Sequence, residues 1–294
     1  MTRITPLLAA FCLTAGAALA DPVTIDTARG PVTVEATPKT VAVFDVAAAD
    51  TLAALGVPAA GLPDKLYVDY LTPAPTTIGT LFEPDLEALS GLNPDLIVLG
   101  GRSAAQFDAV SKVAPTIDMT VSADVVGDAK ARLAAYGALF DKADAAAELA
   151  TALDARIAEA QAAAKDKGTA LIVLTNGPKL SAYGRGSRFG WLHDTIGLPE
   201  AYPNLKPETH GDAISFEFIA EANPDWLIVV DRGAAVGAEG ASAKQTLDNP
   251  LVAGTKAAKA GQVIYLNPAN LYIAGGGYQS LMGNLAEMIA GLKG

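Results

Sequence analysis

A stretch of twenty residues occurs twice in this chain, 130 positions apart. Residues 83–102 read EPDLEALSGLNPDLIVLGGR, and residues 213–232 read AISFEFIAEANPDWLIVVDR. Each copy predicts a short helix, an Asn-Pro-Asp turn that a helix cannot cross, and a buried strand that leads to an arginine. One repeat with half of the chain between its copies indicates two similar α/β lobes, because a solenoid needs many repeats.

The repeat ends with an arginine in both copies, Arg102 and Arg232. Open α/β sheets bind ligands beyond the carboxyl ends of their strands. Two lobes that each place an arginine there predict a cleft that holds an anion from both sides. A single arginine among 32 acidic residues usually pairs with a carboxylate, but the equivalent positions of these two favour a binding role.

The first twenty residues, MTRITPLLAAFCLTAGAALA, have the pattern of a secretory signal peptide. A basic start at Arg3 is followed by an apolar run that is too short to span a membrane, and then by small residues at the cleavage site. We expect export with cleavage after Ala20. A lipoprotein is not expected, because Phe11 before Cys12 is too bulky and the apolar run continues past this cysteine. The mature chain then has no cysteine.

The mature chain is acidic. Without Arg3 it has 20 basic and 32 acidic residues, a net charge of −12. This charge disfavours nucleic acids and anionic membrane surfaces as partners. The 274 residues that remain after removal of the first 20 suffice for two α/β lobes of modest size.

The chain alternates strands with helices in the βαβ rhythm of a parallel sheet. Between the repeat copies, residues 143–166 contain neither Gly nor Pro and predict one rigid helix, about 35 Å long at 1.5 Å per residue. An ordinary packing helix would fit this composition too, but its place favours a rod that joins the lobes. We therefore expect a signal peptide (1–20), an N-terminal lobe (21–142), an interlobe helix (143–167) and a C-terminal lobe (168–294).

The chain has only two histidines, His193 and His210. There is no HExxH motif, no Cys/His cluster and no Gly-x-Ser-x-Gly elbow, so zinc and hydrolase chemistry have no support. Two distant histidines also cannot supply the ligands of a bare zinc or manganese receptor. His210 and Asp212 leave open an exported α/β enzyme with an acid–base pair, but no nucleophile or cofactor motif accompanies them. The glycines at 275–277 before the last helix leave open an anion site made by free backbone N–H groups, but they favour a plain tight turn.

Five segments together resemble the class III periplasmic substrate-binding proteins of ABC importers, in the branch that carries iron–siderophore complexes. They are TVAVFDVAAADTLAALGV (40–57), IGTLFEPDLEALSGLNPDLIVLGGR (78–102), SAYGRGSRFGWLHDTIGL (181–198), SFEFIAEANPDWLIVVDR (215–232) and NLYIAGGGYQS (270–280). The likeness covers nearly the whole mature chain. It implies two Rossmann-like lobes joined by a single long α-helix, with the ligand in a shallow cleft between the lobes.

The resemblance also implies an anion site made by three arginines. Catecholate-binding members use such a triad, and Arg102, Arg188 and Arg232 match its positions. A ferric tris-catecholate has a net charge of about −3, and guanidinium groups donate to its oxygens with fixed geometry. Arg185 is a possible substitute for Arg188, and Trp191 beside this turn is expected in the core rather than against a ligand ring.

Two further pairs of residues match positions with roles in the family. Members that carry tetradentate siderophores complete the octahedron of iron with a histidine and a tyrosine, and His210 and Tyr272 match these positions. Both are therefore expected to ligate Fe(III) when the siderophore leaves two sites open. The family docks on its permease through one glutamate in each lobe, and Glu87 and Glu217, which are equivalent in the repeat, match them.

The sequence thus predicts a periplasmic receptor that captures a ferric siderophore, of the catecholate type and possibly tetradentate, and delivers it to the permease of an ABC importer in the inner membrane. Such a receptor is not an enzyme and has no intrinsic cofactor, and we expect it to be a monomer. The alternative within the same fold is a receptor for haem or cobalamin. Haem would take Tyr272 or His210 as an axial ligand, but three arginines exceed what its two propionates need.

Overall fold

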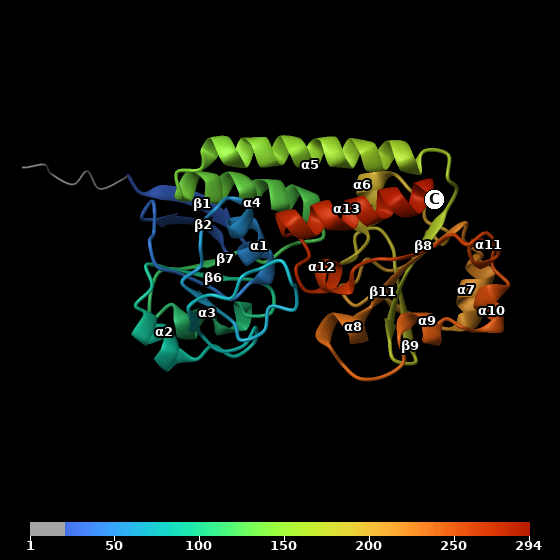
Figure 1. The fold of residues 1–294 in the computed structure, drawn as a ribbon, viewed down its shortest axis with the longest axis horizontal. Coiled ribbons are helices and arrows are strands. Elements are labelled where there is room, and N and C mark those ends of the chain that lie inside the picture. The colour runs from blue at the N-terminus through green and yellow to red at the C-terminus, as the bar shows by residue number, and fades with distance from the viewer. Residues whose placement is uncertain (1–20) are drawn as a thin grey trace, which may run out of the picture.

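A computed structural model describes residues 21–294, so the signal peptide expected at residues 1–20 lies outside the described residues. Two α/β lobes lie side by side beneath one long helix, α5 (Ala143–Ala164), which runs above both of them (Figure 1). This helix occupies most of the segment that the sequence assigned to the connection between the lobes.

The N-terminal lobe, drawn from blue to green in Figure 1, is built on a parallel sheet in which the order of strands is β5-β4-β3-β6-β7. A two-stranded antiparallel hairpin of β1 and β2 precedes it. The strands are β1 (Val23–Thr27), β2 (Gly30–Val34), β3 (Val41–Val43), β4 (Gly61–Leu62), β5 (Thr76–Thr77), β6 (Leu96–Leu99) and β7 (Thr116–Asp118). The helices are α1 (Val46–Ala54), α2 (Leu86–Leu92), the 3-10 helix η1 (Ala104–Gln106), α3 (Phe107–Val110) and α4 (Val125–Leu139).

The C-terminal lobe repeats this arrangement with one difference. Its sheet has the order β10-β9-β8-β11-β12, so β8 and β11 take the places of β3 and β6, but β9 and β10 run antiparallel to their neighbours. The strands are β8 (Ala170–Asn176), β9 (Lys179–Tyr183), β10 (Asp212–Ile214), β11 (Trp226–Asp231) and β12 (Val263–Tyr265). The helices are α6 (Trp191–Ile196), α7 (Phe216–Ala222), α8 (Arg232–Val236), α9 (Ala243–Thr246), α10 (Pro250–Ala253), α11 (Lys256–Lys259), α12 (Pro268–Tyr272) and α13 (Tyr278–Lys293).

The two copies of the sequence repeat form the same local structure. Helices α2 and α7 end at Asn93 and Asn223, whose φ angles of 49° and 41° place them in the left-handed region that asparagine tolerates. The proline that follows prevents further helix. Asp95 then accepts hydrogen bonds from the backbone just before β3, including 2.8 Å from N of Thr40, and Asp225 does the same before β8. Each turn is thus bonded to the start of the neighbouring strand, β3 or β8, and this positions the buried strand that follows the turn, β6 or β11.

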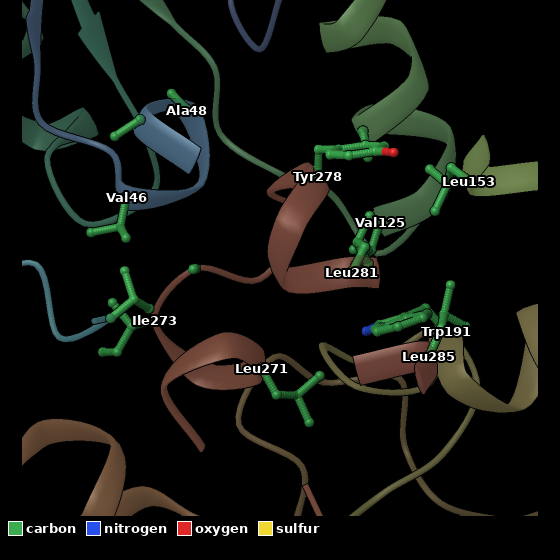
Figure 2. Packing of buried hydrophobic residues seen from close by; sticks show 14 of the residues in the cluster. Val46, Ala48, Val125, Leu153, Trp191, Leu271, Ile273, Tyr278, Leu281 and Leu285 are labelled. Atoms are coloured by element: carbon green, nitrogen blue, oxygen red, sulfur yellow. The ribbon is translucent and has the colours of Figure 1, made fainter. Parts of the chain in front are cut away.

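The lobes share a hydrophobic core. Buried side chains from the N-terminal lobe (Val46, Ala48), from α4 and α5 (Val125, Leu153) and from the C-terminal lobe pack in one cluster, with Leu281 and Leu285 of α13 among them (Figure 2). Helix α13 packs along α5 and also contacts α1. A shared core of this kind opposes large movements of one lobe against the other.

The start of α13 is capped by a carboxylate from the other lobe. Asp50 of α1 is fully buried and accepts hydrogen bonds from N of Gln279 (2.6 Å), from N of Ser280 (2.8 Å) and from the hydroxyl of Tyr70 (2.7 Å). Its carboxylate therefore satisfies amides that the first turn of a helix leaves unpaired. A Cβ at Gly277, directly before the helix, would lie 2.6 Å from this carboxylate. The lack of a side chain at Gly277 therefore allows Asp50 to approach α13.

Two details of the C-terminal lobe were not predicted from the sequence. Residues 250–259 form two short helices, α10 and α11, with Gly254 and Thr255 between them, and the side chain of Thr255 caps α11. Strands β9 and β10 were not anticipated, because their pattern is short and their pairing is antiparallel within an otherwise parallel sheet. No helix in residues 21–294 is long and apolar enough to cross a membrane.

Candidate functional site

A cavity of about 580 Å³ lies between the lobes. Both lobes contribute to its walls, together with the start of α4. It is lined by Asp45, Tyr67, Leu81, Phe82, Gly101, Arg102, Thr120, Val121, Ser122, Val125, Arg188, Trp191, Thr209, Arg232, Val236, Leu271, Tyr272, Ile273 and Gly275. The volume lies in the usual range for small-molecule sites.

Three arginines surround the ring of Tyr272 in this cavity. The guanidinium carbons of Arg102, Arg188 and Arg232 lie 5.5, 4.3 and 5.7 Å from the ring centroid. Arg232 Nε donates to the hydroxyl of Tyr272 at 3.0 Å. Arg102 and Arg188 both donate to its backbone oxygen, at 2.6 and 2.5 Å. The structure therefore brings the two repeat arginines and Arg188 to one place, with Tyr272 at the centre.

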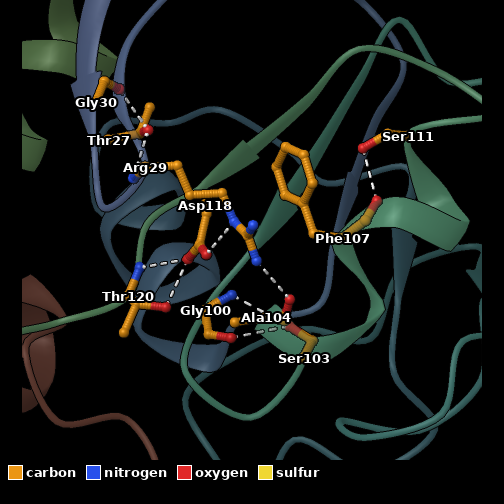
Figure 3. A network of polar contacts seen from close by, with 10 residues as sticks. All are labelled: Thr27, Arg29, Gly30, Gly100, Ser103, Ala104, Phe107, Ser111, Asp118 and Thr120. Atoms are coloured by element: carbon orange, nitrogen blue, oxygen red, sulfur yellow. Dashed lines mark hydrogen bonds and ion pairs between the residues drawn. The ribbon is translucent and has the colours of Figure 1, made fainter.

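The turn after β6, which contains Arg102, is fastened by a polar network around Gly100, Ser103 and Ala104 (Figure 3). The buried hydroxyl of Ser103 exchanges hydrogen bonds with N and O of Gly100, at 3.1 and 3.2 Å, and closes the turn after β6. Arg29 of the β1–β2 hairpin donates to O of Ala104 and to the carboxylate of Asp118, each at 3.0 Å. The loop that carries Arg102 is thus fastened on both of its sides. Arg102 itself reaches into the C-terminal lobe through the carbonyls of Tyr272 and Ile273.

Arg188 stands on a compact turn between β9 and α6. The buried hydroxyl of Ser187 donates to O of Gly184, and Gly186 takes a φ of 74° that favours glycine. Arg185 on the same turn does not line the cavity and pairs with Asp194 and Glu200. The cavity position thus belongs to Arg188 and not to the substitute that the sequence left open.

Trp191, expected in the core, is 4% exposed and also lines the cavity wall. The only other tryptophan, Trp226, is absent from that lining.

The three cavity arginines have no carboxylate partner within 4.0 Å among the described residues, whereas Arg29 and Arg185 do. Burial and the neighbouring charge of Arg188 lower the pKa of Arg102. Partial burial of Tyr272 by itself would raise the pKa of its phenol, but the hydrogen bond from Arg232 and the three positive charges outweigh it and hold that pKa below its usual value. Clustered like charges without counter-ions are costly, and an anionic ligand would remove this cost.

Asp45 is the one acidic residue among the described residues that line the cavity. It follows β3 and stands at the N-cap position of α1, where its side chain makes no capping hydrogen bond. Burial raises the pKa of this carboxyl, and the charges of Arg132 and Arg102 oppose the rise. A raised pKa weakens Asp45 as a counter-charge for Arg102.

The two histidines differ in their surroundings. His193 is buried, and its Nδ1 lies 2.9 Å from O of Leu198, so it is a satisfied core residue. His210 is exposed and does not line the cavity, although its neighbour Thr209 does. The structure thus places Tyr272 in the site and His210 outside its wall. Residues 21–294 contain no group of three or more His, Cys, Asp or Glu side chains that could hold a metal ion.

Glu87 and Glu217 are both exposed and occupy the same position, the second residue of α2 and of α7. A hydrogen bond with the side chain of Ser215 lowers the pKa of Glu217. An acidic residue in the first turn also interacts favourably with the helix dipole, so their position has a structural explanation as well.

Sequence reasoning missed several residues of the cavity wall, among them Asp45, Tyr67 and Phe82. Tyr67 and Phe82 stand on loops between β4 and α2, where no periodic pattern shows which way a side chain faces. For Asp45 a signal existed, because it follows a buried strand as the repeat arginines do.

The model of the family "Periplasmic binding protein" matches residues 41–269. The chain belongs to this family. The family and the relatives named below are binding proteins, so the alternative of an exported enzyme finds no support among them.

The periplasmic binding proteins most similar to this chain include receptors for iron complexes. The petrobactin-binding protein YclQ of Bacillus subtilis is 38% identical over 264 residues, which cover 87% of this chain and 83% of the relative, and its crystal structure matches with a TM-score of 0.86. The ferric-anguibactin-binding protein FatB of Vibrio anguillarum is 30% identical over 94% of this chain and 89% of its own. The crystal structure of the periplasmic catecholate-siderophore binding protein VctP of Vibrio cholerae matches with a TM-score of 0.83 and 34% identity, and covers 92% of this chain and 100% of that one. These matches establish the class III binding-protein fold.

Proposed function

We propose that this protein is the substrate-binding component of an ABC importer and that it captures a ferric siderophore of the catecholate type. The observation that carries the proposal is the cluster of Arg102, Arg188 and Arg232 around Tyr272, without carboxylate partners among the described residues, in a cavity between the lobes. Three similar proteins support a ferric siderophore as the ligand, because by their names they bind petrobactin, ferric anguibactin and a catecholate siderophore.

The test is a titration of the mature protein with the Fe(III) complexes of a tetradentate and of a hexadentate catecholate. Trp191 in the cavity wall provides a fluorescence signal, and Trp226 lies outside the wall. Saturable quenching by either complex, and none by free Fe(III), is the expected result. Binding of haem or cobalamin in place of both complexes would refute the proposal.

His210 and Tyr272 are proposed as the protein's ligands to Fe(III) when the siderophore leaves two coordination sites open. The lowered pKa of Tyr272 supports this role, because it favours the phenolate form, and a phenolate is a hard anionic partner for a hard cation such as Fe(III). His210 would reach the metal only if the loop around residues 206–211 moved inward. We expect the tetradentate complex to shift its visible charge-transfer band on binding, and the double variant His210→Ala with Tyr272→Phe to lose the shift and affinity. Unchanged affinity of the double variant would refute direct ligation.

Glu87 and Glu217 are proposed as the contacts with the permease, one on each lobe. Their equivalent positions and their exposure support this role. Reversal of both charges, Glu87→Lys with Glu217→Lys, is expected to stop uptake by whole cells and to leave siderophore affinity unchanged. A loss of affinity would count against docking.

The proposal also includes export to the periplasm with cleavage after Ala20, a monomeric receptor, and the division into lobes 21–142 and 168–294 around the helix 143–167. The N-terminal sequence of the secreted protein and its mass in solution test the first two points. A protein that keeps residues 1–20, or that forms a stable dimer, would correct them.

A further inference from the structure

Phe82 is the most exposed large apolar side chain among the described residues of the cavity wall, at 55% of its surface. A single exposed apolar side chain is common on protein surfaces, so the exposure of Phe82 gains its meaning from the place of this ring in the cavity wall. Hydrogen bonds within its loop hold the ring in this exposed position.

The turn that carries Phe82 is tightly closed. Thr80 donates from N to O of Glu83 at 2.9 Å, and its hydroxyl accepts from N of Phe82 and N of Glu83 at 3.2 and 3.0 Å. Gly79 has a φ of 108°, and a Cβ there would lie 2.4 Å from O of Glu83, so only glycine fits. Leu81 is buried beside it, and the ring of Phe82 is presented outward.

A second aromatic residue of the same lobe lines the cavity with a strained backbone. Tyr67 has a φ of 67°, a conformation that bulky residues rarely adopt and that persists only where the surroundings enforce it. Lys65 contributes to this, because its Nζ lies 4.5 Å from the centroid of the Tyr67 ring and 3.4 Å from O of Val236 in the other lobe. Val236 is itself part of the cavity wall.

The cavity wall therefore combines two kinds of group. Both lobes supply guanidinium groups (Arg102, Arg188 and Arg232), and both supply aromatic side chains (Tyr67 and Phe82 of the N-terminal lobe, Trp191 and Tyr272 of the C-terminal lobe). Guanidinium groups donate to anionic oxygens, and aromatic side chains pack on other rings in offset or edge-to-face arrangements. A ligand that satisfies both kinds of group carries its anionic oxygens on aromatic rings.

We propose that Phe82 and Tyr67 are specificity-determining residues that select ferric complexes with aromatic donor groups over ferric complexes of aliphatic carboxylates. The arginines bind the charge of either class, and the two rings bind only the aryl class. This inference rests on the proposed function and adds to it the residues that select its ligand. The competing role for Phe82, a contact with the permease near Glu87, predicts a different outcome in the experiment below.

The test compares the affinities of the mature protein for a ferric catecholate and for ferric citrate by quenching of tryptophan fluorescence. Phe82→Leu removes the ring but keeps apolar bulk, and Phe82→Tyr keeps the ring. Leu86→Ala, at a residue that is 44% exposed and outside the cavity wall, is the matched control. Tyr67→Leu and Tyr67→Phe form the same pair at the second ring.

We expect each leucine variant to weaken catecholate binding by about three- to ten-fold, the size of a lost aromatic pair, and to leave binding of ferric citrate within about two-fold. The ring-bearing variants and the control should match the unaltered protein. Equal losses for both complexes, or no loss for either leucine variant, would overturn the inference. Lost uptake with full catecholate affinity in Phe82→Leu would assign this ring to docking instead.

The failure of this inference differs from a failure of the proposed function. An unaltered protein that binds neither complex refutes the function itself. An unaltered protein that binds both complexes equally well keeps the function and refutes the selectivity for aromatic donors.

Discussion

Replacement of Arg188 by methionine removes one of the three guanidinium groups around Tyr272 and leaves a side chain of similar length. In the structure Arg188 donates to the backbone oxygen of Tyr272 at 2.5 Å, and Arg102 donates to the same oxygen, so the fold keeps a partner there when Arg188 is lost. Arg188 therefore contributes to ligand binding more than to the position of Tyr272.

The magnitude follows from the kind of bond that is lost. A hydrogen bond to a charged group contributes about 1.5–3 kcal/mol. Since about 1.4 kcal/mol corresponds to a factor of ten, Arg188→Met should weaken the binding of a ferric tris-catecholate by about 10- to 150-fold. Fluorescence titration at physiological ionic strength measures this ratio, and circular dichroism shows whether the variant keeps its fold.

Arg185→Met is the matched control. Arg185 stands three positions earlier on the same turn and outside the cavity wall, where it pairs with Asp194 and Glu200. Its replacement changes the net charge by the same amount but removes no guanidinium group from the cavity wall. Affinity should change by no more than about two-fold. If the Arg185 variant loses as much affinity as the Arg188 variant, net charge and not the arginine cluster explains binding, and the reasoning is refuted.

Three further predictions concern pH and stability. Arg232→Gln should raise the pKa of Tyr272, because it removes the hydrogen bond that favours the phenolate; an alkaline absorbance titration against Tyr272→Phe measures this, and an unchanged pKa would contradict it. Burial raises the pKa of Asp50 from 3.8 to about 6. Between these two pH values the folded state therefore binds more protons than the unfolded state, and the free energy of unfolding increases as the pH falls. The gain from this group is at most about 3 kcal/mol. Urea unfolding near pH 7 and near pH 4.5 should show this gain in the unaltered protein and not in Asp50→Asn. Arg29→Ala should lower the free energy of unfolding by about 1–3 kcal/mol, because it leaves the buried carboxylate of Asp118 without its cation. Arg156→Ala, which breaks an exposed ion pair, should lower it by less than about 1 kcal/mol. Equal losses would show that the ion pair of Arg29 with Asp118 does not stabilise the fold.

The parts of the fold that the sequence predicted are those encoded locally. Each repeat copy combines a short helix, an Asn-Pro turn and an apolar run, and these signals act within about ten residues of one another. Helices α2 and α7 therefore start at equivalent residues, Leu86 and Phe216, and end at the asparagines of the repeat. The position of an arginine after each buried strand was visible for the same reason.

Other parts depend on contacts between distant residues. Asp50 caps a helix that lies 229 residues away in the chain, so the sequence around residues 275–277 showed only a tight turn. The side chains of Tyr67 and Phe82 face the cavity because of the loops that hold them, and neither loop has a periodic pattern. Arg188 and Tyr272 were found through resemblance to a family, since their own surroundings in the sequence carry no signal that separates them from Arg185 or from other tyrosines.

The most direct measurement is a crystal structure of the mature protein with a ferric tris-catecholate, with the iron located by its anomalous scattering. The account predicts iron in the cavity between the lobes, with Arg102, Arg188 and Arg232 all donating to the catecholate oxygens. Iron outside this cavity, or a complex held by residues of one lobe alone, would contradict it.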